Sequence, residues 1–197
     1  MKVEDSRELV SGRTSERISD DSAEQTDRAL LARIADRDEC ALREFFLRHA
    51  IHVHKLLRPL SDMRESVEEI LLLDSFVAVW RKAHKFRAKS RALIWLLEIA
   101  YARALASHRS ELARSNGTAA SDCGADVFGN AARPECPSRA LVQLPFVQRA
   151  AIELAYGLGL SCDEMASVMQ CSPKIVKTRL LYARRALDLA SPEMARK

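Results

Sequence analysis

A run of basic side chains near the carboxyl end is the strongest sign of chemistry in this sequence. The segment SPKIVKTRLLYARRAL, residues 172–187, spaces lysines and arginines through apolar residues. Such side chains neutralise phosphates, and polar residues at the start of a helix can reach base edges in the DNA major groove. A solvated surface helix would carry the same charges, so the neighbouring elements must decide between the two interpretations.

Those neighbours predict a helix-turn-helix. The glycines within residues 157–159 would end a first helix, and Ser161 with Glu164 has the capping-box spacing of a second, short helix. Ser172 as N-cap and Pro173 at the first helical position would start a longer third helix. Its inward apolar stripe would consist of Val176, Leu180, Ala183 and Leu187. The opposite face would then be free to bind DNA.

The residues predicted to contact duplex DNA belong to this third helix. Those in its first turns would approach base edges or groove phosphates, whereas the later arginines would hold phosphates. The predicted set is Ser172, Lys174, Lys177, Thr178, Arg179, Tyr182, Arg184 and Arg185. We expect Lys177→Ala and Arg179→Ala to weaken binding, and Glu24→Ala near the amino end to leave it unchanged.

A second basic stretch, WRKAHKFRAKSR at residues 80–91, holds six lysines and arginines and no acid. Its aromatic residues Trp80 and Phe86 are followed by Trp95. This mixture suits single-stranded nucleic acid, because bases stack on rings while charges follow the backbone, although the rings could also be core residues. The predicted single-strand site consists of Arg81, Lys82, Lys85, Phe86, Arg87, Lys89 and Arg91.

Helical periodicity without alternating strand patterns predicts an all-α chain of two small helical domains joined by a flexible linker. Residues 1–25, rich in Ser, Asp, Glu and Arg, are expected to form a disordered tail. The first domain would span 26–110, the Gly-, Ser- and Pro-containing linker 111–139, and the helix-turn-helix domain 140–190. Within the first domain, Ser66 and Glu69 have capping-box spacing.

Composition narrows the class of protein further. The chain has 197 residues, 48% of them hydrophobic and 29% charged, and a net charge of +4 whose excess lies in residues 42–110. It has neither a long apolar run nor an apolar leader, so we expect a cytoplasmic protein that does not insert into membranes. The five cysteines form no C-x-x-C pair, so reduced thiols are expected. A thiol switch, Cys162 with Cys171 or Cys123 with Cys136, is the alternative.

Several motifs fall in the order of one protein family. The carboxyl-terminal block resembles the fourth conserved region of bacterial RNA polymerase sigma factors, especially the extracytoplasmic-function (ECF) group. The matching residues are Leu144-Pro145, Gly159-Leu160-Ser161, Glu164-Met165-Ala166, Val176 to Leu180, and Ala183-Arg184. The second conserved region is similar to the segment that contains Phe76, Trp80, Phe86, Trp95-Leu96 and Ile99-Ala100. The resemblance covers about residues 27–190.

This resemblance implies an alternative sigma factor that binds core RNA polymerase and promoter DNA. The domain at 140–190 would bind the minus-35 element, and the domain at 26–110 would melt the minus-10 element. An anti-sigma factor would be a further partner. The implied polymerase-binding residues are Glu69, Ile70, Leu73, Asp74 and Trp80.

Departures from the family pattern keep a second interpretation open. Ile70 and Leu73 stand where the family carries an Asp and a Gln, and Ala102 and Ala106 stand where it carries an Asn and an Asp. The chain could therefore be a sigma-like DNA-binding regulator, or a decoy for an anti-sigma factor, that does not initiate transcription. The same departures make ILLLDSFVAVW apolar almost all round, which predicts a helix that is buried on every side or covered by a partner.

We expect no enzymatic activity, metal or cofactor. The segment HAIHVH places His49 and His52 on one helical face and His54 well away from both, and no carboxylate or cysteine nearby completes a metal site. Surface or interface histidines are the expectation. No glycine-rich phosphate loop and no nucleophile motif is present.

Overall fold

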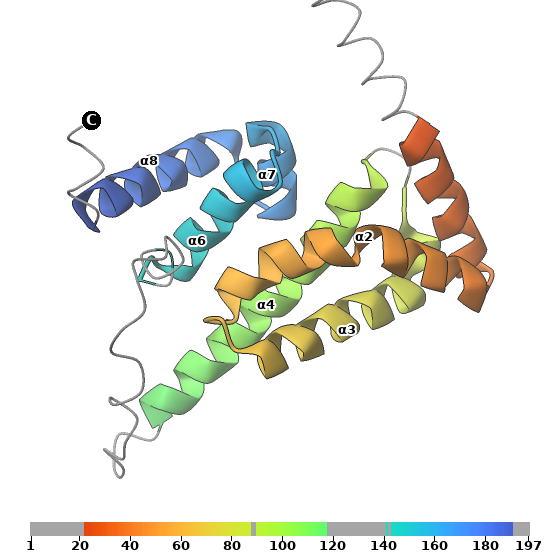
Figure 1. Cartoon of the computed structure of the whole chain (residues 1–197), viewed down its shortest axis with the longest axis horizontal. Coiled ribbons are helices and arrows are strands. Elements are labelled where there is room, and N and C mark those ends of the chain that lie inside the picture. The colour runs from red at the N-terminus through yellow and green to blue at the C-terminus, as the bar shows by residue number, and fades with distance from the viewer. Residues whose placement is uncertain (1–21, 88–89, 118–140, 142, 191–197) are drawn as a thin grey trace, which may run out of the picture.

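The computed structural model describes residues 22–87, 90–117, 141 and 143–190, and within these ranges the chain forms helices and no strand, which confirms the all-α class. Figure 1 shows α2, α3 and α4 side by side, with α6, α7 and α8 gathered on one side of them. The elements are a helix at 22–35, α2 (Glu39–Leu60), α3 (Glu65–Lys82), the 3-10 turn η1 (Ala83–Lys85), α4 (Ala92–Gly117), α6 (Phe146–Ile152), the π-helical turn η2 (Glu153–Gly157), α7 (Cys162–Val168) and α8 (Pro173–Ala190).

Local signals explain most of these boundaries in the amino-terminal half. Asp38 caps α2 by accepting a hydrogen bond from the Ala41 amide at 3.1 Å. Pro59 lies in the last turn of α2, which ends at Leu60. The predicted capping box of Ser66 and Glu69 is wrong, because α3 begins at Glu65 with Arg64 as N-cap and no side-chain cap. The first amides of α3 therefore lack the side-chain partner that the spacing suggested.

Two expected domain boundaries differ from the helices. Residues 22–25, expected at the end of the tail, lie in the first helix, and residues 111–117, expected in the linker, lie in α4. The remaining parts of both segments, residues 1–21 and 118–139, lie outside the described residues. Partners from distant parts of the chain lie at both ends: Glu24 in the first helix contacts Ala92, and Glu111 in α4 pairs with Arg64 at 2.7 Å.

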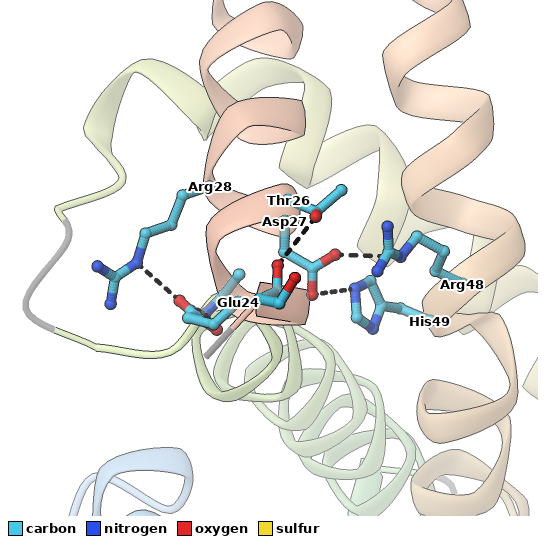
Figure 2. Close-up of polar contacts among 8 residues, drawn as sticks. Glu24, Thr26, Asp27, Arg28, Arg48 and His49 are labelled. Atoms are coloured by element: carbon cyan, nitrogen blue, oxygen red, sulfur yellow. Dashed lines mark hydrogen bonds and ion pairs between the residues drawn. The ribbon is translucent and has the colours of Figure 1, made fainter. Parts of the chain in front are cut away.

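Glu24 is one such partner, and Figure 2 shows its surroundings. Its carboxylate accepts hydrogen bonds from the Ala92 amide at 3.0 and 3.1 Å and from the Arg28 Nε at 2.9 Å. The Ala92 amide lies at the start of α4, where amides have no acceptor within their own helix, so Glu24 acts as an N-terminal cap from a different helix. Glu24 is therefore a structural residue. The substitution Glu24→Ala, named above as one that should leave DNA binding unchanged, would remove this cap from α4.

A buried carboxylate and its polar partners join the first helix to α2. Asp27, 5% exposed, lies 2.9 Å from the Nε2 of His49, which is 6% exposed, and 3.3 Å from the Arg48 Nε (Figure 2). A buried carboxylate requires such partners, because an unpaired charge in a low-dielectric interior is costly. The expectation of surface or interface histidines is therefore wrong for His49, which lies in the interior beside Phe45.

One continuous apolar core connects the two halves of the described chain. Phe45, Leu57 and Leu96 from the amino-terminal helices and Leu154 and Met165 from the carboxyl-terminal helices are fully buried in it. A smaller cluster of Leu144, Ile152 and Ala183 lies inside the carboxyl-terminal half. The two halves are therefore packed against each other and share buried apolar surface, the main source of stabilisation in a folded chain.

Candidate nucleic-acid interface

The helix-turn-helix forms as its local signals predict. Gly159 has φ of 67°, a left-handed conformation that glycine adopts without strain, and it follows directly on the turn that ends η2. Ser161 and Glu164 form a complete capping box: the Ser161 Oγ accepts from the Glu164 amide, and the Glu164 carboxylate accepts from the Ser161 amide at 2.9 Å. The capping box sets the start of α7.

The start of α8 and its inward face also follow the predicted pattern. Pro173 is the first residue of the helix, and the Ser172 Oγ accepts a hydrogen bond from the Ile175 amide at 3.4 Å. Val176 and Ala183 are fully buried, and Leu180 packs against the same apolar surroundings. The helix therefore turns one stripe inward and the opposite stripe to solvent.

Most residues predicted to contact duplex DNA lie on this solvent-facing stripe. The exposed members are Ser172, Lys174, Lys177, Thr178, Tyr182, Arg184 and Arg185. The Thr178 hydroxyl donates to the Lys174 carbonyl at 3.0 Å, and the Arg184 guanidinium stacks over the Tyr156 ring and donates to its hydroxyl. This face presents several positive charges and few acids along one helix, as DNA phosphates require.

Arg179 has a different environment from the other basic residues of α8. Its guanidinium lies 3.5 Å from the Cys171 Sγ and 3.9 Å from the Met169 Sδ, and the residue is half-buried. Burial raises the pKa of the nearby Tyr101 hydroxyl, and the Arg179 charge opposes that rise. Arg179 is thus directed toward the turn after α7, away from the exposed basic face.

Two exposed apolar residues on α8 were not among the residues predicted to contact DNA. Ile175 and Leu181 are 44% and 49% exposed among the basic side chains. An apolar side chain on a groove-facing helix can contact the methyl group of thymine. The sequence places both residues outside the inward stripe of α8, and that position alone predicts that the core does not cover them.

The second basic stretch lies where α3 gives way to η1 and α4. Arg81, Lys82, Lys85 and Arg87 are exposed, and the half-buried Phe86 contacts Trp95 edge-to-face with ring centroids 5.3 Å apart. Lys89 lies outside the described residues. The charges are therefore available to solvent, whereas the Phe86 ring is partly occupied by Trp95.

Arg91, at the end of this stretch, contacts the helix-turn-helix. Its guanidinium lies 3.2 Å from a carboxylate oxygen of Glu164, the capping residue of α7. Burial alone would raise the pKa of Glu164, but the hydrogen bonds from Ser161 and the charge of Arg91 hold that pKa below its usual value. The two predicted DNA-binding regions thus meet at this ion pair.

The predicted polymerase-binding residues divide into exposed and partnered ones. Ile70 and Leu73 are 67% and 59% exposed, Val77 beside them is 43% exposed, and Glu69 is also exposed. Asp74 lies 2.9 Å from the Arg103 guanidinium of α4. Of the two expectations for this helix, burial on every side is therefore wrong, and one apolar stripe remains uncovered.

Two further residues near α3 are engaged within the protein. Trp80 receives the Arg37 guanidinium over its ring, 5.3 Å from the centroid, and its carbonyl accepts from Arg37 at 3.1 Å. Glu68 is buried and paired with the His54 Nδ1, so its carboxylate does not lie at the surface of α3. The Trp80 ring is therefore partly covered by Arg37 and is not fully available to a partner.

The described residues contain no group of three or more histidine, cysteine or acidic side chains placed to hold a metal. In the part of the chain that the structure describes, Cys40, Cys162 and Cys171 are free thiols, while Cys123 and Cys136 lie outside it. Over the same residues, every helix is too short or too polar to cross a membrane. The features that remain are surfaces, two basic and one apolar.

Comparison with known proteins agrees with this all-helical architecture. A family model described as sigma-70, region 4, matches residues 138–187. One solved structure similar in fold is CnrH in complex with the cytosolic domain of CnrY, with TM-score 0.63 and 24% identity, covering 85% of this chain and 99% of that chain. Another is the sigma factor RpoE from Bartonella quintana in complex with the anti-sigma factor NepR, with TM-score 0.60 and 23% identity, covering 74% of this chain and 93% of that chain. The fold and the basic helix-turn-helix are those of sigma factors.

Sequence relatives specify the group. The ECF RNA polymerase sigma factor SigK of Mycobacterium tuberculosis is 32% identical over 173 residues, which cover 81% of this chain and 90% of the relative. The ECF RNA polymerase sigma factor SigM of the same species is 30% identical, over 83% of this chain and 84% of the relative. The chain belongs to the ECF RNA polymerase sigma factors, and it is an alternative sigma factor that directs transcription initiation with core RNA polymerase on promoter DNA.

Proposed function

We propose that the chain divides this task among three surfaces of its described helices. The exposed face of α8 binds the upstream, minus-35 promoter element. The basic stretch from Arg81 to Arg91, with Phe86, binds the separated strand of the minus-10 element. The apolar stripe of α3 docks on core RNA polymerase. The chain acts in the cytoplasm and by binding alone, with residues 26–110 and 140–190 as the two working domains.

The exposed basic face of α8 is the observation that best supports the upstream contact. Lys174 and Lys177 lie in the first two turns of α8, the part of a recognition helix that enters the major groove. Arg184 and Arg185 lie farther along, where phosphates of the flanking backbone are in reach. The inward apolar stripe of α8 is packed against the core, so the helix does not need the basic residues of its exposed face in order to fold.

An anti-sigma factor is a further proposed partner. The sigma factor RpoE, similar in fold to this chain, was solved in complex with the anti-sigma factor NepR. The uncovered apolar side chains of the amino-terminal domain, Ile70 and Leu73, offer surface that such a partner could bury. Polymerase and an anti-sigma factor would then compete for the α3 stripe.

Reconstituted transcription tests the proposal. The purified chain is mixed with core RNA polymerase and a library of promoter fragments from the source genome, and run-off transcripts are sequenced to identify the start sites. Lys174→Ala combined with Lys177→Ala should abolish the transcripts without lowering polymerase binding. Lys55→Ala, an exposed lysine on α2, is the matched control and should leave them unchanged.

The same assay distinguishes a sigma factor that initiates transcription from a sigma-like protein that only binds DNA or an anti-sigma factor. If the chain bound polymerase and duplex promoter DNA but gave no open complex by permanganate footprinting, its amino-terminal half would lack the melting function. Ala102 and Ala106, both exposed on α4, would then account for the loss. If it did not bind polymerase at all, the docking role of α3 would be refuted.

A further inference from the structure

The outward side of α2 carries apolar residues that the described part of the chain does not cover. Leu47 and Ile51, here called the α2 stripe, are 70% and 55% exposed. They are one helical turn apart and therefore lie on the same side of α2. The opposite side of α2, with Phe45, Val53 and Leu56, is buried in the core. The α2 stripe belongs to none of the three surfaces assigned above.

Charges of opposite sign lie at the two ends of this stripe. Glu39 and Glu44 precede it, Lys55 and Arg58 follow it, and all four residues are exposed. Among the residues that the structure describes, no ion pair engages the side chains of Glu39, Glu44 or Arg58. Burial raises the pKa of Glu153 in η2, and the charge of Lys55 opposes that rise. The outward side of α2 is thus acidic, then apolar, then basic.

This order makes the outward side of α2 complementary to itself. In an antiparallel pair of α2 helices centred on the middle of the stripe, the leucine of one copy meets the isoleucine of the other. In the same register Glu44 lies opposite Lys55, and Glu39 lies opposite Arg58. A parallel pair in register would place like charges opposite each other, which is unfavourable. Charge therefore selects the antiparallel arrangement.

We infer that the partner of the α2 stripe is a second copy of this chain, bound as an antiparallel α2–α2 pair about a two-fold axis. Such a pair uses the same surface on both copies, so association stops at the dimer. The stretch from Glu39 to Arg58 is about 28 Å long. A contact between two helices of this length falls among small interfaces, below about 1,200 Å², so the dimer is weak and depends on concentration.

Sedimentation equilibrium of the full chain, from about 5 to about 500 µM, tests self-association. Leu47→Ala with Ile51→Ala should raise the dissociation constant at least about tenfold, because four apolar side chains leave the contact. Ile70→Ala with Leu73→Ala, on the exposed side of α3, is the matched control and should change it less than about threefold. A chain that stays monomeric over the whole range would overturn the inference. Equal losses for the two pairs would overturn the assignment to α2.

An exchange of charges tests the direction of the pair. Glu44→Lys and Lys55→Glu, in separate chains, each place like charges opposite each other and should weaken self-association about fivefold. An equimolar mixture of the two variants should associate as tightly as the unchanged chain, because every Glu44–Lys55 contact then joins opposite charges. The variants Glu39→Lys and Arg58→Glu, which leave Lys55 in place near Glu153, should behave in the same way. Mixtures that associate no better than the single variants would overturn the antiparallel pair.

Disulfide trapping checks the register. Cys40 is an exposed thiol, and it lies as far before the middle of the stripe as Arg58 lies after it. A chain with Arg58→Cys, in which Cys40 is the only native cysteine retained, should form a disulfide-linked dimer on oxidation. The same chain with Arg58 retained should not, because the two Cys40 thiols of an antiparallel pair are about 27 Å apart. A dimer linked through Cys40 alone would show a parallel pair and overturn the inference.

Discussion

The uncovered stripe of α3 allows a quantitative prediction about polymerase binding. The perturbation is the double substitution Ile70→Ala with Leu73→Ala. In the free chain these residues are 67% and 59% exposed, so truncating them removes little packing and the free energy of unfolding should change by less than about 0.5 kcal/mol. Any loss of polymerase binding can therefore be assigned to the docked surface and not to unfolding.

The expected size of that loss follows from the area left to bury. Complete burial of an Ile or Leu side chain stabilises by about 1.5–3 kcal/mol, so covering the exposed portions contributes about 1–2 kcal/mol for each residue. The pair accounts for about 2–4 kcal/mol at most, which corresponds to a loss of affinity between about 30-fold and several hundred-fold. Alanine retains one methyl group, so a value near the lower limit is expected.

The assay is competition of the unlabelled chain against a labelled copy for purified core RNA polymerase. Leu47→Ala with Ile51→Ala is the matched control, because these α2 residues are 70% and 55% exposed and equally apolar. The control should retain affinity within about threefold. Less than a threefold loss for the α3 pair, or equal losses for both pairs, would refute the assignment of polymerase docking to α3.

Three further predictions concern α8, the turn before α7, and pH. Lys177→Ala should reduce the slope of log affinity for duplex DNA against log salt by about 0.9 and leave Tm unchanged. Arg179→Ala should also lower Tm, because its guanidinium contacts Met169 and Cys171. The same Tm for the Lys177→Ala and Arg179→Ala variants would contradict this. Gly159→Ala should cost about 1 kcal/mol, or about 2–4 °C in Tm, because φ is 67° there; an unchanged Tm would show that the left-handed turn is not required. Burial, together with His49 and Lys55, holds the pKa of His52 below its usual 6.5. As pH falls, His52 is therefore protonated in the unfolded chain before it is protonated in the folded one, and the free energy of unfolding should decrease below about pH 6.5. In chemical denaturation at pH 7.5 and 5.5, His52→Gln should reduce that fall, and an identical fall in both proteins would contradict the shift.

The carboxyl-terminal module was the part most accessible to sequence reasoning. Ser161 and Glu164, three residues apart, form their capping box through bonds within one helical turn. Ser172 and Pro173 likewise start α8 where they were expected. Hydrogen bonds at such short range depend little on the rest of the chain, so spacing alone carries the information. Ser66 and Glu69 show the limit of the same rule, because their helix begins two residues earlier than the motif requires, with Arg64 in place of Ser66 as N-cap.

Contacts between distant residues were not accessible in this way. Glu24 was expected in a tail, yet it caps α4 at Ala92, 68 residues away. Arg149 carried no recognisable motif, yet it is buried against Pro59, 90 residues away. No local pattern marks such residues, because their partners are selected by how whole helices pack. The same packing places His49 in the interior beside Asp27.

The amino-acid sequence by itself determined the helical class, the position of the helix-turn-helix and the presence of a basic stripe on α8. Periodicity and capping act within a few residues, so these features can be derived from the chain locally. Only the tertiary structure decided that Ile70 and Leu73 are uncovered, that Arg179 is turned inward and that Arg91 is paired with Glu164. Exposure and pairing of these side chains depend on surfaces brought together from distant segments, and burial of apolar area across the whole fold selects that arrangement.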